Sequence, residues 1–204
     1  MSPERWQGLM QVFGFAANLE VLRALDDAYS EKHRHYHTGE HVDACLCLLD
    51  AHAELAARTH EIALALWFHD AIYRPLSGGN EEGSADWAVR FLAANGAATE
   101  VIERVRAMIL LTRHDAPAQT AGEALLLDID LSILGADVAG YDAYEAAIRK
   151  EYHIVPLPIY RRKRVEVLRG FLERDCIYLT EPFRAERELK ARANLARAIA
   201  ASSG

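Results

Sequence analysis

The segment "HEIALALWFHDAIY", which directly follows Thr59, limits the possible folds of the chain more than any other. On a helix it is apolar on nearly every side until it reaches the adjacent pair His69-Asp70. A helix with no polar face is normally covered by other elements. The segment therefore predicts a central, buried helix that is capped by Thr59 and leads into the His-Asp pair.

Helical signals also dominate the rest of the chain. Ser2 followed by Pro3 suits a helix N-terminus, and an apolar pattern continues from there toward Tyr29. The sequence has no alternating apolar-polar run of useful length, no internal repeat and no low-complexity tract. We therefore predict an all-α fold, a bundle of roughly seven to nine helices, that forms a single domain over residues 1–204.

Composition excludes several classes of protein. The net charge is −7, whereas a nucleic-acid-binding domain usually carries a basic face, so we expect no nucleic acid polymer as a partner. The N-terminal residues lack the features of a signal peptide, and no stretch approaches about 20 consecutive apolar residues. Cys45, Cys47 and Cys176 form no C-x-x-C motif and fit buried thiols in a reducing compartment. These features predict a cytoplasmic protein outside the membrane and leave its oligomeric state open.

Histidines gather next to carboxylates in this chain. Four lie in "KHRHYHTGEHV" and two precede an aspartate, namely His33, His35, His37 and His41 in the first group and His69 and His114 in the second. Imidazole and carboxylate together suit divalent metals such as Zn, Fe, Mn or Ni. An aspartate at the end of an apolar helix needs a partner or a metal, because burying an unpaired charge is costly. For the dipeptide alone, a core histidine beside a turn-capping aspartate is the simpler explanation.

Two further pairs have metal-ligand spacing. Asp128 and Asp130 lie in "LLLDIDLSILG", and on a helix only one of them can face a given site. Both could instead lie on a solvated face, but the surrounding leucines and isoleucines leave little room for one. His37 and His41 are four residues apart and can share a helix face. This spacing lacks the glutamate of a zinc peptidase motif, and a solvated polar turn is the alternative, which we prefer for His33 and His35.

The motifs "YHTGEH", "WFHD" and "DIDLS", in that order, resemble the HD superfamily of metal-dependent phosphohydrolases, whose pattern is H…HD…D on separate helices. The first and last motifs are also similar to those of cyclic nucleotide phosphodiesterases. The segments "NEEGSADWA", "LLTRHD", "IRKEY" and "ERELKARANL" resemble a narrower group of predicted HD phosphohydrolases, and this similarity covers nearly the whole length.

The resemblance implies a role for particular residues of this chain. It makes His41, His69, Asp70 and Asp130 the metal ligands, and it makes His37 the general acid toward the leaving oxygen, with Asp70 also in the catalytic set. Thr38 stands where the family usually has Asn, which leaves the orientation of His37 open.

The resemblance also implies a cofactor and a substrate class. The cofactor would be a divalent ion such as Mn, Mg, Fe, Co, Ni or Zn, and Asp70 could bridge a second one. Five residues are candidates for that second metal or for the substrate: Glu81, His114, Arg34, Arg113 and Arg149. For Glu81 and His114, helix-terminal positions that suit the helix dipole are the alternative.

The function that we expect is hydrolysis of a nucleotide or another small phosphate ester by a metal-activated water. A regulatory module that binds a metal or nucleotide without turnover remains an alternative, because a fold and its ligands do not guarantee catalysis. An HD-type di-iron oxygenase is a third possibility, which extra histidines such as His114 would support.

Overall fold

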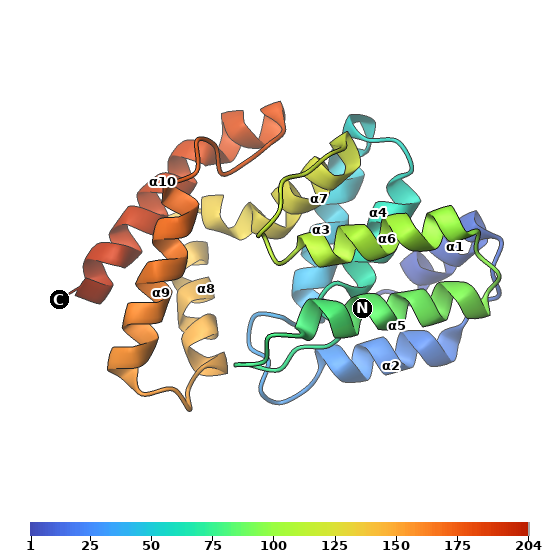
Figure 1. Cartoon of the computed structure of the whole chain (residues 1–204), viewed down its shortest axis with the longest axis horizontal. Helices are drawn as coiled ribbons and strands as arrows, with labels where there is room; N and C mark the ends of the chain where they lie inside the picture. The colour runs from blue at the N-terminus through green and yellow to red at the C-terminus, as the bar shows by residue number, and fades with distance from the viewer. Residues whose placement is uncertain (204) are drawn as a thin grey trace. The chain divides into compact units, whose positions relative to one another are not determined.

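The computed structural model describes residues 1–203, and this part of the chain contains ten α-helices and no strand (Figure 1). The predicted all-α fold is therefore confirmed, although the helix count exceeds the predicted number. The chain divides into two compact units, Met1–Leu126 and a second that begins at Leu127. The expectation of one domain stays a prediction. Within the described residues, no helix is long and apolar enough to cross a membrane.

The first unit contains six complete helices, a short 3₁₀ helix and the start of a seventh helix. These elements are α1 (Pro3–Phe13), α2 (Leu19–Tyr29), α3 (Gly39–Ala51), η1 (Ala53–Leu55), α4 (Thr59–Phe68), α5 (Asn80–Ala94), α6 (Thr99–Leu111) and α7 (Ala121–Asp130). Helix α4 packs against α1, α3, α5 and α6, so the predicted central helix is confirmed. Its cap is not Thr59 but Arg58, in the left-handed conformation with φ 54°.

Aromatic rings surround the C-terminal half of α4. The ring of Trp67 meets Trp6 of α1 edge-on with centroids 5.2 Å apart, and Phe68 stacks on Phe91 of α5 at 5.5 Å. Trp67 and Phe68 are both fully buried. Large, rigid side chains at these positions fix the end of α4, and with it the backbone that carries His69 and Asp70.

The predicted helix from Ser2 toward Tyr29 is wrong as one element, because the chain breaks between α1 and α2. The Ser2 side chain caps α1 by accepting a hydrogen bond from the Arg5 N–H, as predicted. The helix then ends at Gly14, which has φ 70°. A residue in this left-handed conformation terminates a helix, and glycine adopts it without steric cost. This break accounts for the additional helix.

The second unit begins within α7 and continues through η2 (Leu131–Gly135), α8 (Val138–Glu151), α9 (Leu157–Leu172) and α10 (Glu181–Ser203). Helix α10 packs against α9 and η2, and α8 also packs against η2. Only Cys45 is a buried thiol, whereas Cys47 is exposed and Cys176 is half-buried. The expectation for Cys47 was wrong because two residues along α3 turn its side chain away from the core.

Candidate metal centre

His41 and His69 come from two helices of the first unit that pack against each other, α3 and α4. His41 lies in the first turn of α3, and His69 directly follows the last residue of α4. Both imidazoles are buried. The His69 N–H still donates to the Ala65 carbonyl at 2.8 Å, so the helical hydrogen bonding extends to this residue and limits its movement.

The two imidazoles approach through their Nε2 atoms. The Nδ1 atom of His69 lies 2.8 Å from the Leu66 carbonyl oxygen, so it must carry a proton and donate it there. Nε2 of His69 therefore points the other way, and it lies 3.2 Å from Nε2 of His41. A histidine held in this way, with one nitrogen donating to a backbone carbonyl, is typical of metal ligands.

The carboxylate of Asp70 lies beside the same two nitrogens. Its Oδ2 atom is 3.0 Å from Nε2 of His69 and 3.8 Å from Nε2 of His41. Burial would raise the pKa of Asp70, but the imidazoles of His69, His37 and His41 and the hydrogen bond with His69 outweigh it. The pKa of this carboxyl therefore lies well below its usual range, and the group is ionised at neutral pH.

These three atoms fit the ligands of one cation. Two nitrogens at about 2.0–2.1 Å from a tetrahedral zinc lie about 3.3 Å apart, close to the 3.2 Å between Nε2 of His41 and His69. A carboxylate oxygen and two imidazole nitrogens all present lone pairs, so their convergence requires a proton or a metal ion among them. The donor set suits Zn, Fe, Mn, Co or Ni, and one carboxylate also allows Mg.

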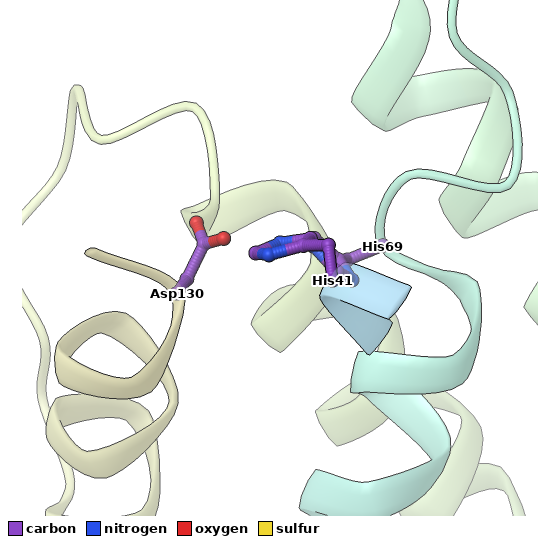
Figure 2. Close-up of side chains that lie close together, drawn as sticks. All are labelled: His41, His69 and Asp130. Atoms are coloured by element: carbon purple, nitrogen blue, oxygen red, sulfur yellow. The ribbon is translucent and has the colours of Figure 1, made fainter. Parts of the chain in front are cut away.

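His41, His69 and Asp130 carry the kinds of ligand atom that could hold a metal ion, and Figure 2 labels their side chains. Asp130 is the last residue of α7, the helix that begins in the first unit and ends in the second. Asp128, two residues earlier, belongs to a different environment. It is buried, and its carboxylate accepts hydrogen bonds from the backbone N–H groups of Leu179 and Thr180, at 2.7 Å each. Asp128 therefore faces residues 179 and 180, which explains why only one of the two aspartates is a candidate ligand.

His37 lies in the loop just before α3 and is half-buried. Its ring stacks on that of Tyr73 with centroids 4.2 Å apart, and Tyr36 meets it edge-on at 5.1 Å. It is one of the imidazoles whose charge lowers the pKa of Asp70. Thr38 is the N-cap of α3 but makes no side-chain capping bond. The rings of Tyr36 and Tyr73 therefore help to orient His37, a contribution that residue spacing does not reveal.

Four of the other candidates lie on other elements. Glu81 is in the first turn of α5, and His114 follows α6 with φ 59°. Arg113 pairs with Glu82 and Asp115. Arg149, in the second unit, donates to the Tyr152 carbonyl at 2.6 Å and lies over the ring of Tyr160.

Arg34 is the fifth candidate, and its guanidinium is inaccessible to solvent. It donates to backbone carbonyl oxygens on both loops that adjoin the imidazoles. Sequence reasoning proposed a contact with substrate and missed this arrangement. The only local signal was the position of Arg34 three residues before His37, which does not reveal contacts with residues 70 and 71.

Comparisons of the chain with family models, with curated proteins and with solved structures found no match. The residues and their geometry therefore carry the functional argument.

Proposed function

We propose that the chain is a metal-dependent phosphohydrolase of the HD type that acts on a nucleotide or another small phosphate ester. The observation that carries the proposal is the convergence of three ligand atoms in the first unit: Nε2 of His41, Nε2 of His69 and Oδ2 of Asp70. Asp130 would complete the set. The order of these residues along the chain, and the phosphodiesterase-like sequence around them, favour phosphate ester hydrolysis over other metal chemistry.

A divalent cation bound here would supply a hydroxide nucleophile at neutral pH, because a bound cation lowers the pKa of water from 15.7 to about 7. The protein's own residues do the remaining work. The Leu66 carbonyl keeps the proton of His69 on Nδ1, so that Nε2 stays available as a ligand. Asp70 stays ionised because its pKa is lowered, so its carboxylate oxygen also stays available as a ligand.

His37 is the proton donor in this proposal. It adjoins His41 with ring centroids 6.3 Å apart, close enough to reach a substrate held beside that ligand. The stacked ring of Tyr73 restricts its rotation. An imidazole in this place can protonate the leaving oxygen, a contribution that is typically worth about 10²- to 10⁴-fold in rate.

The proposal is tested by purifying the protein with Mn, Mg, Co, Ni or Zn and assaying a panel of nucleotides and small phosphate esters. We expect one of these metals to support turnover. His69→Ala should lose both metal and activity, whereas His37→Ala should keep the metal and lose most of kcat. His153→Ala is the matched control, since His153 is an exposed histidine of the second unit.

Two outcomes would overturn the proposal in different ways. If the purified protein holds no metal and His69→Ala leaves any activity unchanged, the metal centre is wrong. If metal binds but neither the wild type nor His37→Ala turns over any phosphate ester, hydrolysis is wrong and a metal-binding module without turnover is favoured.

A further inference from the structure

We propose that Arg34 is a positioning residue of the metal centre. It fixes the position of the Asp70 backbone relative to the His37 backbone. This inference rests on the proposed function, because it assumes that Asp70 binds the metal and that His37 is the proton donor. It assigns Arg34 a task other than contact with the substrate phosphate.

The guanidinium of Arg34 joins two segments that lie outside the helices. Its Nη1 donates to the carbonyl oxygens of His37 at 3.0 Å and Asp70 at 2.7 Å, and its Nη2 donates to that of Ala71 at 3.1 Å. Its Nε donates to the carboxylate of Glu31 at 3.0 Å. Three of these four bonds thus go to backbone carbonyls of the two residues with proposed roles and of the residue after Asp70.

The surroundings of Arg34 hold this arrangement in place. Its side chain is fully buried, and its guanidinium lies 5.2 Å from the ring centroid of Tyr29 and 5.4 Å from that of Tyr73. Tyr73 is also the ring on which His37 stacks. His33 adds a parallel connection, because its Nε2 lies 2.8 Å from the Tyr73 carbonyl oxygen.

Arginine is the side chain that this position requires. Backbone carbonyls in irregular segments need donors when they are buried, and the planar guanidinium offers five N–H groups in a rigid fork. The carbonyls of Asp70 and Ala71 follow the C-terminus of α4, where the helix dipole also favours a cation. A lysine would keep the charge but could not bridge carbonyls on two segments in a rigid geometry.

Arg34→Lys tests the inference, with Arg104→Lys as its control. Arg104 also makes a bidentate interaction, with the buried Glu61 at 2.7 Å to each oxygen. That pair lies at the N-terminal end of α4, away from His69. Both variants lose a planar guanidinium that bonds to more than one acceptor, and both should melt at a lower temperature. Only Arg34→Lys should disturb the metal centre.

The measurement is the binding of Co²⁺, by titration and by the visible absorption of the bound ion. For Arg34→Lys we expect a Kd about 10- to 100-fold higher than for the wild type and a changed spectrum, whereas Arg104→Lys should match the wild type in both. An Arg34→Lys variant with the wild-type Kd and spectrum would overturn the inference alone. A wild-type protein that binds neither Co²⁺ nor any of Mn²⁺, Mg²⁺, Ni²⁺ and Zn²⁺ would overturn the proposed function.

Two further measurements serve if Arg34→Lys does not fold or if the wild type binds no Co²⁺. Glu31→Gln removes the negative charge of the half-exposed partner of Arg34 and should raise the Kd by a smaller factor, so a wild-type Kd in this variant contradicts the inference. In metal-free Arg34→Lys, hydrogen exchange should accelerate both around His37 and around Asp70–Tyr73. Unchanged exchange in either segment would show that Arg34 does not hold the two together.

Discussion

Nδ1 of His69 lies 2.8 Å from the carbonyl oxygen of Leu66, one turn earlier in the chain. This single contact decides which nitrogen of the imidazole faces Nε2 of His41, 3.2 Å away. A backbone carbonyl cannot accept or release a proton at ordinary pH, so the tautomer of His69 is set by the local helical backbone and not by the metal.

Metal should therefore stabilise the folded protein, because the ligand atoms converge only when it is folded. At a metal concentration of about 100 times Kd, we expect about 2.7 kcal/mol of additional stability, measured as a rise in melting temperature on adding Mn²⁺ or Zn²⁺ to chelator-treated protein. His69→Ala should show no rise, and His153→Ala should show the wild-type rise. An equal rise in all three proteins would mean that the metal binds elsewhere.

Asp128→Asn and Asp130→Asn should have opposite consequences. Asp128 is 1 % exposed and accepts hydrogen bonds from Leu179, Thr180 and the Thr180 hydroxyl, so Asp128→Asn should lower the free energy of unfolding by about 1–3 kcal/mol. It should leave metal affinity unchanged. Asp130→Asn should weaken metal binding with little loss of stability. Urea denaturation and metal titration of both variants measure this, and a reversed pattern would contradict both assignments.

The stability of the metal-free protein should depend on the ionisation of Asp70. The pKa of Asp70 is lowered in the folded state, so its ionised form adds stability above the unfolded pKa of about 3.9. That contribution is lost as the pH falls below this value. The stability advantage of the wild type over Asp70→Asn should therefore shrink between about pH 5 and pH 2.5. Denaturation at several pH values measures it, and a constant difference would refute the expectation.

Asp128 provides an internal contrast for this experiment, because burial raises its pKa. A raised pKa means that stability is greatest below the unfolded value and is lost as the pH rises through the folded one. The comparison of wild type with Asp128→Asn should therefore change in the opposite direction across the same pH range.

Gly14→Ala should destabilise the protein although an added Cβ would contact nothing within 4 Å. Its φ of 70° is the only source of the cost, about 1 kcal/mol for a residue with a Cβ. Gly8→Ala is the matched control, since Gly8 lies inside α1 with equally open surroundings. It should stabilise by up to about 1 kcal/mol. Thermal unfolding measures both, and equal effects would show that the α1 terminus does not depend on the left-handed conformation.

The residue pattern alone was sufficient for the fold class and for the placement of α4. A helix without a polar face can only be central, and helical periodicity is a local property that a single sequence carries. The residue pattern did not predict that α1 ends at Gly14, because apolar residues continue on both sides of this glycine. The residue pattern also could not separate Asp128 from Asp130, because the hydrogen bonds to Asp128 come from residues 179 and 180, far away in the chain.

For the candidate site, the amino-acid sequence by itself determined the chemical types of the candidate ligands and their order along the chain: His41, His69 and Asp70, with His37 nearby. Only the tertiary structure decided that Nε2 of His69 faces His41 and that Arg34, from the loop before α3, reaches the loop after α4. The first fact depends on the packing of α3 against α4, and the second on the distant Asp70 and Ala71 carbonyls that accept hydrogen bonds from Arg34. Side-chain direction and the choice of partner follow from packing, which residue spacing does not encode.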